Sequence, residues 1–335
     1  MSLILFCVFL SFAIAWFITP WLIRYLRRIG IIVRDANKER QPLVPISGGL
    51  AVFSGFFGGI MFFVFYRTFF PGVDIGYHLV LTPKELLSLF SGLLTIFIIA
   101  LVGFLDDLVI KPNKEASSGL RQWQKPLLTL TASVPLMVVN VGTMVMAVPF
   151  LGKVNFGILY PLVLVPIGVV GASNMVNMLA GFNGMETGMG IINIGMLGLY
   201  AFVYERYVAA LIAAILCPAL LAFYYYNRYP AKILPGDSLT YLVGGAMAVL
   251  AIVGNMERAA LIVSIPFFIE FILKSRKRFK ADSYGFCKDG TIHSKYDKIY
   301  SIPHLFSRTG KFTEKQITYF MMAIALLFSS LIWVV

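Results

Sequence analysis

The chain has 335 residues, of which 59% are hydrophobic and 13% are charged, and its formal net charge is +12. A water-soluble globule of this length could not bury so much apolar surface, so the composition excludes one and indicates a polytopic membrane protein. The positive charge raises the alternative of nucleic-acid binding. We expect no nucleic acid, because the basic residues flank apolar segments, where they orient the chain and contact anionic lipid headgroups.

Ten apolar segments are predicted to span the membrane as helices, because about 20 apolar residues suffice to cross the hydrocarbon core. The segments at 126–139 and 239–253 are short for a span. The first segment carries its arginines after the apolar run, which is typical of a retained anchor and not of a cleaved signal peptide. The ten segments lie near residues 3–23, 46–66, 86–105, 126–139, 158–173, 188–203, 207–225, 239–253, 259–273 and 317–335.

The polar loops between these segments differ sharply in charge. Alternate loops contain 23 of the 28 Lys and Arg residues, and residues 274–316 alone contain 11 of them. Because basic loops stay in the cytoplasm, we predict an all-α membrane protein of about ten helices, with both termini outside the cytoplasm and any active site on the cytoplasmic face. We expect residues 1–335 to form one domain, since the 274–316 loop is too short and too basic to fold as a separate enzyme.

Two adjacent carboxylates, Asp106 and Asp107, end the third predicted span. On a helix they point about 100° apart, so one could face a site while the other orients a neighbour. A solvated pair at a helix end is the alternative, and the apolar residues on both sides of the pair weigh against it.

A run of amides and one carboxylate follows at residues 174–186. Asn174 and Asn177 are three residues apart and share a helix face, whereas Asn183 and Glu186 follow in a glycine-containing loop. Amide and carboxylate oxygens at a membrane boundary suit Mg²⁺, which retains waters that phosphates can replace. The alternative is that the asparagines only join helices through hydrogen bonds.

Further charged residues stand at the ends of spans on the same predicted side. Asp237 begins the eighth span and is the natural second metal ligand, although an Asp there is often only a helix cap. Lys125 begins the fourth span, where an ammonium group either meets a lipid phosphate or merely snorkels to the headgroups. Arg276 and Arg278 follow the ninth span and either bind a pyrophosphate or only stop the span.

The cysteines and two of the histidines carry no functional prediction. Cys7, Cys217 and Cys287 are scattered, and their spacing indicates neither a disulfide framework nor a metal site. His293 and His304 are interpreted as ordinary loop histidines.

Three motifs occur in order at the predicted cytoplasmic ends of spans. With them the chain resembles the polyprenyl-phosphate N-acetylhexosamine-1-phosphate transferases over residues 30 to about 300. Within this family it looks most like the branch of eukaryotic and archaeal enzymes that use UDP-GlcNAc and dolichyl phosphate. The motifs are Gly103-Phe104-Leu105-Asp106-Asp107, Asn174-x-x-Asn177-x-x-Ala-Gly-x-Asn183-Gly-x-Glu186 and Gly236-Asp237.

The resemblance implies a reaction. A sugar-1-phosphate, GlcNAc-1-phosphate in this branch, passes from a UDP-sugar to a polyprenyl or dolichyl phosphate and UMP is released, as in the first membrane step of N-glycan-type, lipid-linked glycan assembly. It also implies Mg²⁺, for which Mn²⁺ could substitute, at Asn177 and Asp237, and uridine contacts near Asn183. The candidate residues are Asp106, Asp107 and Lys125 for catalysis, Asn177 and Asp237 for the metal, and Asn174, Asn183, Glu186, Arg276 and Arg278 for the UDP-sugar.

Alternatives stay open at this point. The histidine-rich loop of the bacterial peptidoglycan-precursor branch is missing, which favours UDP-GlcNAc over a UDP-MurNAc-pentapeptide or another donor used in cell-envelope polymers. A secondary transporter would place its polar residues near the bilayer midplane. Here they cluster at helix ends on one side, and Glu270 is the main exception. The expected partners are a UDP-N-acetylhexosamine, the lipid phosphate and membrane lipids, with a homodimer left open. The expected location is the cell membrane of a prokaryote or the endoplasmic reticulum of a eukaryote.

Overall fold

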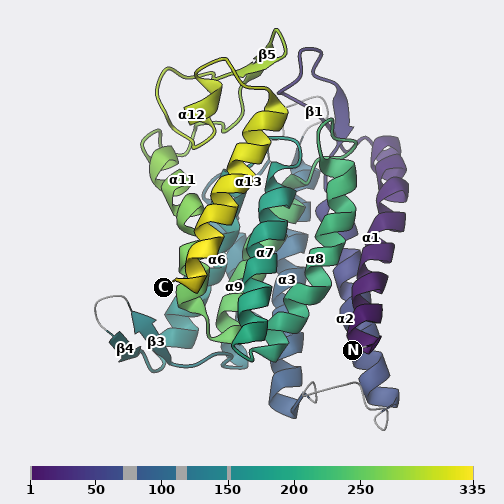
Figure 1. Ribbon diagram of the computed structural model, residues 1–335, viewed down its shortest axis with the longest axis vertical. Helices are drawn as coiled ribbons and strands as arrows, with labels where there is room; N and C mark the ends of the chain where they lie inside the picture. The colour runs from purple at the N-terminus through teal and green to yellow at the C-terminus, as the bar shows by residue number, and fades with distance from the viewer. Residues whose placement is uncertain (1, 71–80, 111–118, 149–151, 335) are drawn as a thin grey trace.

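The computed structural model describes residues 2–70, 81–110, 119–148 and 152–334, and its long helices run side by side (Figure 1). Within these residues eight helices are long and apolar enough to cross a membrane. This confirms the prediction of a helical, polytopic membrane protein. The eight are α1 (Ser2–Ile29), α2 (Gly49–Phe69), α3 (Pro83–Val109), α6 (Val165–Met178, extended by the turn Tyr160–Leu164), α7 (Met185–Val203), α8 (Tyr207–Asn227), α9 (Gly236–Gly254) and α13 (Glu314–Ser330, extended by the turn Leu331–Trp333).

The predicted segments at 126–139 and 259–273 are also helical, but each is broken into short pieces. Pro135 lies in the first turn of α5 and Pro266 in the first turn of α11. Proline has no backbone N–H, which costs no hydrogen bond in the first turn of a helix. It cannot donate to the preceding helix, however, so that helix ends before it. The pieces are α4 (Gln124–Leu130), a 3-10 turn (Thr131–Ser133), α5 (Val134–Val138), α10 (Glu257–Val263) and α11 (Ile265–Ser275).

Helices α3 and α13 begin three residues before the predicted apolar segments, because a polar cap starts the first turn of each. In α3, Thr82 accepts a hydrogen bond from the backbone N–H of Glu85, whose side chain accepts one from the N–H of Thr82. Thr313 and Gln316 form the same capping box at the start of α13. Each box satisfies backbone donors that have no partner within the helix.

Among the described residues, three two-stranded antiparallel hairpins and one short helix lie in the connections. The first hairpin joins α1 to α2 and pairs Val33 with Val44. The third hairpin and the short helix belong to the long loop between α11 and α13. The elements are β1 (Ile32–Arg34) with β2 (Leu43–Pro45), β3 (Val145–Val148) with β4 (Gly152–Asn155), β5 (Phe286–Lys288) with β6 (Thr291–His293), and α12 (His304–Ser307).

Helix α9 is at the centre of the bundle and contacts α2, α3, α6, α7 and α8. Most of its length is buried, and residues such as Tyr241 and Leu242 are inaccessible. One cluster of buried apolar side chains draws on all eight long helices. The amino-terminal end of α9 is therefore held by several neighbours at once, which matters because Asp237 lies there.

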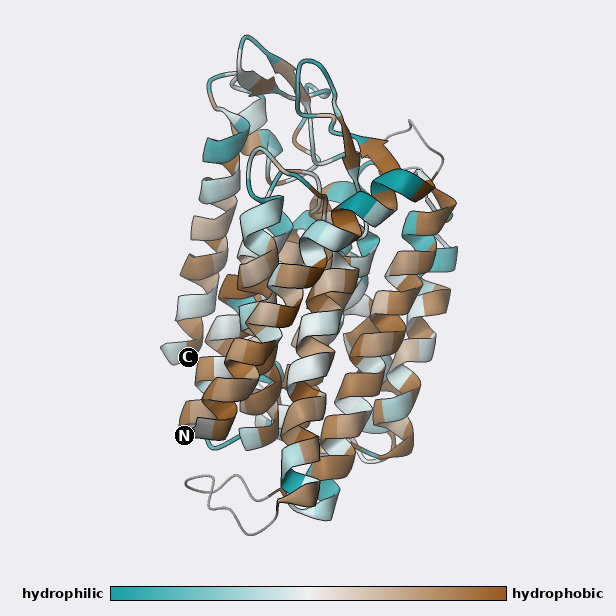
Figure 2. Cartoon of the chain, turned by 90° about the vertical axis from the view of Figure 1, so that its right-hand side faces the viewer, coloured by the Kyte–Doolittle hydropathy of each residue, from teal (hydrophilic) through white to brown (hydrophobic). Residues whose placement is uncertain are grey.

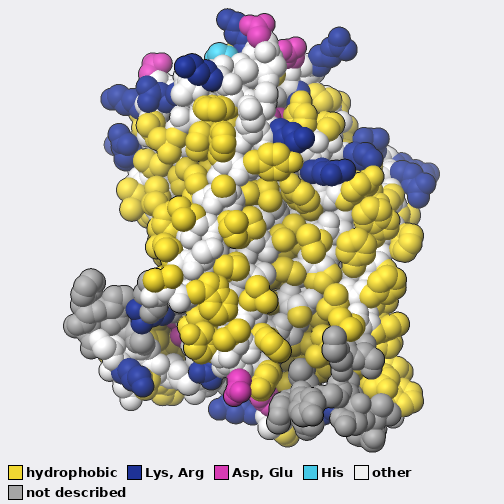
Figure 3. Space-filling view, in the orientation of Figure 1, with side chains coloured by type: hydrophobic (Ala, Val, Ile, Leu, Met, Phe, Trp, Pro, Cys, Tyr) yellow, Lys and Arg dark blue, Asp and Glu magenta, His cyan; other side chains and the backbone are white. Residues whose placement is uncertain are grey.

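The two ends of the bundle differ in polarity. The end that carries β1, β5 and α12 is hydrophilic, whereas the bodies of the helices are mostly hydrophobic (Figures 1 and 2). On the visible face, most Lys and Arg side chains gather at that end, above a broad belt of hydrophobic side chains (Figure 3). Both termini lie away from it (Figure 1). The loops that the sequence assigns to one side thus meet at one end of the molecule.

Candidate active site

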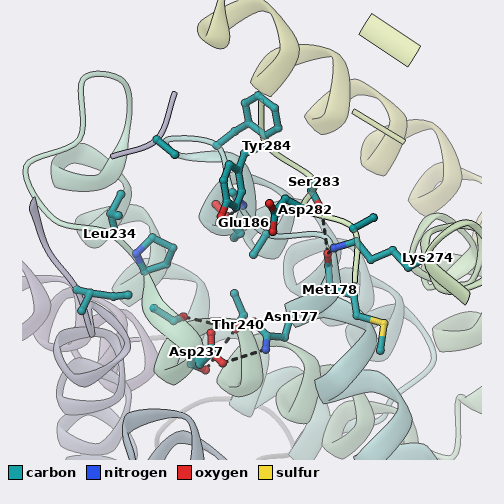
Figure 4. Close-up of a pocket in the computed structure, with 18 of the residues that line it drawn as sticks. Asn177, Met178, Glu186, Leu234, Asp237, Thr240, Lys274, Asp282, Ser283 and Tyr284 are labelled. Atoms are coloured by element: carbon teal, nitrogen blue, oxygen red, sulfur yellow. Dashed lines mark hydrogen bonds between the residues drawn. The ribbon is translucent and has the colours of Figure 1, made fainter. Parts of the chain in front are cut away.

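A cavity of about 380 Å³ opens at the hydrophilic end of the bundle. One wall comes from residues 34–36 and from the turn between α6 and α7, and another from residues 279–284 of the long loop. Asn177, Asp237 and Thr240 lie together at one side of the cavity, and Asp282, Ser283 and Tyr284 lie across from them (Figure 4). These three connections of the bundle thus converge with the ends of α6 and α9 on one space.

Lys125 joins two carboxylates at the edge of this cavity. Its Nζ atom lies 2.5 Å from Oδ2 of Asp106 and 2.8 Å from Oδ2 of Asp237. Asn177 donates a hydrogen bond of 3.1 Å to the same Asp237 oxygen. The structure therefore brings four candidates from α3, α4, α6 and α9 into direct contact, although they lie up to 131 positions apart along the chain.

Asp107 is buried and contacts the first turn of α9 instead of the lysine. It accepts hydrogen bonds from the backbone N–H groups of Asp237, at 2.7 Å, and Ser238, at 3.2 Å. A carboxylate is favourable there because the first turn of a helix exposes unpaired N–H donors and the positive end of the helix dipole. The adjacent carboxylates thus have different surroundings: Asp106 contacts the lysine, and Asp107 holds the start of α9.

Two glycines allow this close approach of α3 and α9. A Cβ atom at Gly103 would lie 2.3 Å from the carbonyl oxygen of Asp237, and one at Gly236 would lie 2.3 Å from Oδ2 of Asp107. Gly236 also has a φ angle of +70°, which L side chains rarely adopt. The glycines of the Gly-Phe-Leu-Asp-Asp and Gly-Asp motifs are therefore a packing requirement of the site.

Asp237 does not act as a helix cap. The cap position before α9 is Pro235, and no side chain makes a capping hydrogen bond there. The Asp237 carboxylate turns to Lys125 and Asn177 instead. The capping alternative for this residue is wrong.

The two asparagines of α6 join helices, each toward a different neighbour. Asn174 donates to Thr129 Oγ1 of α4 at 3.0 Å, and Oδ1 of Asn177 accepts a hydrogen bond of 2.9 Å from Thr240 of α9. Both residues also line the cavity. Helix joining and a place in the site are therefore compatible for this pair.

Asn183 lies in the turn between α6 and α7, and its polar side-chain atoms are already bonded within the protein. Its Nδ2 donates to Asp35 at 3.1 Å, and its Oδ1 accepts from Lys38 and from the N–H of Ala231, both at 2.9 Å. Glu186 accepts a hydrogen bond from the backbone N–H of Gly181 in the same turn. Asn183 and Glu186 line the cavity while they hold this turn in shape.

The structure does not bring Arg276 or Arg278 to the described lining of the cavity. The guanidinium group of Arg276 bonds to the backbone oxygen of Ile299 and lies over the ring of Tyr300. The lysines that line the cavity from this part of the chain are Lys274 and Lys280. The sequence prediction chose the two arginines because their forks suit a pyrophosphate, and it gave neither lysine a role of its own. The spacing of Glu270 and Lys274, one helical turn apart, was the available signal.

Mg²⁺ would have to be held by few protein ligands. Among the described residues no group of three or more His, Cys, Asp or Glu side chains is placed to hold a metal ion. The donor set still fits one, because Asp106, Asp107 and Asp237 carry three formal negative charges against the single positive charge of Lys125. Asp237 and Asn177 offer oxygens to the cavity, and phosphates and water would complete the shell of a hard cation.

His304 anchors the long loop from inside. It is fully buried, its Nδ1 accepts from the N–H of Tyr300, and its Nε2 lies 3.0 Å from the backbone oxygen of Asp282. Burial lowers the pKa of the His304 imidazole, and nearby Lys274 acts in the same direction. The side chain is therefore neutral, with the proton on Nε2 and the lone pair on Nδ1.

We expect the protein to lose thermal stability as the pH falls below about 6.5. Below that value the unfolded chain binds a proton at His304 that the folded chain resists, so unfolding is favoured until the pH reaches the lowered folded pKa. Melting temperatures between about pH 7.5 and 5.5 should show this slope. His304→Gln, which can still accept and donate, should flatten it, whereas His293→Gln should not. Equal slopes in all three proteins would contradict the assignment.

Known proteins with similar sequences place the chain in a family. The model of the family described as glycosyl transferase family 4 matches residues 89–255. A relative from Saccharolobus solfataricus, a putative UDP-N-acetylglucosamine–dolichyl-phosphate N-acetylglucosaminephosphotransferase, is 33% identical over 97% of this chain and 94% of its own length. A protein of the same description from Sulfolobus acidocaldarius is 34% identical over 98% and 94%. The phospho-N-acetylmuramoyl-pentapeptide-transferase of Lactiplantibacillus plantarum is 30% identical over 78% of each chain.

The similarities to the Saccharolobus solfataricus and Sulfolobus acidocaldarius relatives extend over nearly the whole chain. The chain belongs to glycosyl transferase family 4. It is an enzyme of the glycosyl-1-phosphate transferase class, which confirms the family and enzyme class expected from the three motifs.

Proposed function

We propose that this protein transfers GlcNAc-1-phosphate from UDP-GlcNAc to a polyprenyl or dolichyl phosphate and releases UMP. The observation that carries the proposal is the group formed by Lys125, Asp106, Asp237 and Asn177 beside a cavity at the hydrophilic end of an apolar bundle. Two relatives described as using UDP-N-acetylglucosamine and dolichyl phosphate, similar over nearly their full length, support the choice of substrates.

The chemistry needs charge neutralisation more than it needs a base. An oxygen of the lipid phosphate attacks the sugar-linked phosphorus of the donor, and the bond from that phosphorus to the oxygen of UMP breaks. The attacking phosphate monoester has a second pKa near 6, so at neutral pH it is already mostly a dianion. The main obstacle to its attack is the repulsion between this dianion and the negatively charged pyrophosphate of the donor. Positioned cations lower that barrier as charge shifts to the departing UMP.

Each residue of the group then has a role. The Lys125 ammonium neutralises the incoming lipid phosphate, and Asp106 holds the ammonium in place. Asp107 fixes the start of α9, so that Asp237 faces the cavity. Asp237 and Asn177 would hold Mg²⁺, which supplies positive charge to the pyrophosphate. Attack is direct and needs no phosphorylated enzyme, because the lipid phosphate itself is the nucleophile.

The donor would lie across the cavity. The resemblance assigns the uridine to the wall around Asn183, which leaves the wall formed by residues 279–284 for the sugar. Lys280 is exposed on that wall and Arg34 on the opposite one, where both can neutralise phosphate charge. This replaces the role first expected of Arg276 and Arg278.

Donor preference tests the proposal. Purified protein with a polyprenyl phosphate should release UMP from UDP-GlcNAc, and release should require both the lipid and a divalent cation. UDP-MurNAc-pentapeptide is the specific alternative, because the Lactiplantibacillus plantarum relative is described as a transferase of phospho-N-acetylmuramoyl-pentapeptide. Faster release from the pentapeptide donor than from UDP-GlcNAc would reject our choice of sugar.

We further propose ten membrane crossings, with the hydrophilic end in the cytoplasm and both termini on the other side. The broken segments α4–α5 and α10–α11 would be the two crossings beyond the eight long helices. The concentration of Lys and Arg at the hydrophilic end supports this orientation. The membrane would be the cell membrane of a prokaryote or the endoplasmic reticulum of a eukaryote.

Cysteine labelling in intact cells should reveal this orientation. In a protein lacking Cys7, Cys217 and Cys287, an impermeant reagent should modify Lys153→Cys in the β4 strand and spare Lys288→Cys in the β5 strand. Both positions are exposed, so access depends on the side of the membrane. Permeabilised cells provide the control, because both cysteines should then react. Labelling of Lys288→Cys but not of Lys153→Cys from outside would show that the protein has the opposite orientation.

A further inference from the structure

Helix α11 has two unlike faces. Ile269, Phe271 and Ile272 are 40%, 41% and 62% exposed, as expected of side chains that meet lipid. Glu270 is completely buried and Lys274 is 7% exposed, one helical turn apart on the inner face. Burying a carboxylate costs free energy unless hydrogen bonds and opposite charge compensate for it, so its surroundings should explain it.

The Glu270 carboxylate binds two separate parts of the long loop. Its Oε1 accepts hydrogen bonds from Ser301, at 2.6 Å, and from Ser283, at 3.3 Å. Its Oε2 accepts one of 2.8 Å from the backbone N–H of Ile302. Ser283 belongs to the cavity wall, whereas Ser301 lies just before α12. One buried side chain thus fixes two parts of the loop that are 18 positions apart.

Lys274 and Ser283 extend the same network to α6. Lys274 lies 3.6 Å from Oε1 of Glu270, and its ammonium group donates to the backbone oxygen of Met178. The Ser283 hydroxyl lies 3.0 Å from that same oxygen and shares its single proton between it and Glu270, and Figure 4 shows the Lys274 and Ser283 side chains converging on the Met178 oxygen. Met178 is the last residue of α6 and follows Asn177 directly. The wall at residues 279–284 is therefore tied to the helix that presents Asn177.

Glu270 itself does not touch the cavity. It is fully buried and is not among the described residues that line the space, whereas Lys274 and Ser283 are. Any effect of Glu270 on a substrate must therefore pass through the residues that it holds. We propose that Glu270 is a positioning residue that holds the 279–284 wall at the distance from Asn177 that the donor sugar requires. This inference rests on the proposed function, which assigns that wall to the sugar.

Glu270→Gln tests the inference with little change in shape. Glutamine has only one acceptor oxygen. If that oxygen keeps the N–H of Ile302, the NH₂ group faces Ser301, Ser283 and the Lys274 ammonium, all of which point donors at the carboxylate in the wild type, and the charge opposite Lys274 is lost. The affinity for UDP-GlcNAc should fall roughly tenfold or more, as expected when a charge-assisted contact is lost. Affinity for UDP, which lacks the sugar, should change by less than about twofold. In kinetics the KM for UDP-GlcNAc should rise while the KM for the lipid phosphate holds.

Two further variants separate positioning from general damage. Ser301→Ala removes one bond to Glu270 outside the cavity and should shift the same affinity in the same direction, by less. Glu257→Gln is the matched control: this carboxylate accepts a hydrogen bond from Tyr160 and begins α10, away from the cavity. It should leave both affinities unchanged.

The outcomes are distinct. Equal losses of UDP and UDP-GlcNAc affinity in Glu270→Gln, or unchanged affinities in a folded variant, would overturn the inference. If Glu270→Gln does not fold, Ser301→Ala decides by the same ratio of affinities. A wild-type protein that transfers no sugar phosphate would defeat the proposed function instead, so the two failures can be told apart.

Discussion

Asp237→Asn should lower the rate of sugar-phosphate transfer by orders of magnitude while the protein stays folded. Lys125 and Asn177 both direct their hydrogen bonds to the same oxygen of Asp237, so an amide oxygen placed there can accept both. The substitution therefore removes the charge and leaves the contacts. Without that carboxylate the metal would lose the only charged protein ligand assigned to it, and the pyrophosphate much of the positive field that offsets its charge.

Transfer rate against Mg²⁺ concentration is the measurement for this variant. If weakened metal binding is the main loss, high Mg²⁺ or Mn²⁺ should restore part of the activity. The melting temperature should hardly change, and Asp289→Asn in the exposed β5–β6 turn should behave as wild type. Normal activity with normal metal dependence in Asp237→Asn would remove this residue from the metal site.

Lys125→Met should weaken the use of the lipid phosphate more than the use of the UDP-sugar. Methionine keeps most of the stem and removes the charge that stands between Asp106 and Asp237. Loss of a charge-assisted contact is worth about 1.5–3 kcal/mol, which is roughly a ten- to hundredfold rise in the KM for the acceptor. Because two carboxylates then lose their shared partner, the melting temperature should also fall.

Steady-state kinetics with each substrate varied in turn separates these effects. Lys125→Arg keeps the positive charge and should retain part of the activity with the lipid acceptor. It should not retain all of it, because the planar guanidinium group of arginine differs in shape from the compact ammonium group of lysine. An acceptor KM that stays at the wild-type value in Lys125→Met would leave Lys125 as a counter-ion of the carboxylates, without a role toward the lipid.

Hydrophobic runs and loop charge were enough to predict the helices and the loops that gather at one end. They failed on continuity: α4–α5 and α10–α11 are broken near Pro135 and Pro266, and periodicity cannot show how a chain resumes after a break. The starts of α3 and α13 were also predicted too far along the chain, because the capping boxes at Thr82 and Thr313 lie outside the apolar runs.

The residues of the site were easier to predict than their contacts. Asp106, Lys125, Asn177 and Asp237 stand at span ends on one predicted side, so their meeting follows from topology. The sequence could not show that Asn183 is bonded on every polar side-chain atom, because its partners come from distant segments.

The long loop was the hardest part of the site to read. Its basic residues look alike in sequence, and only packing separates Lys274, at the cavity, from Arg276 at Ile299.

The central claim is that a sugar and its phosphate move together from a nucleotide to a lipid. UDP-GlcNAc labelled with ³²P on the sugar-linked phosphate and with ¹⁴C in the sugar tests it directly, with purified protein, a polyprenyl phosphate and Mg²⁺. We predict that both labels enter the solvent-extractable lipid in equal molar amounts, with one UMP released per transfer and with a transfer rate lower by orders of magnitude for Asp237→Asn. Entry of the ¹⁴C label alone would show that only the sugar moves and that UDP leaves, which would contradict the account. So would the absence of both labels from the lipid.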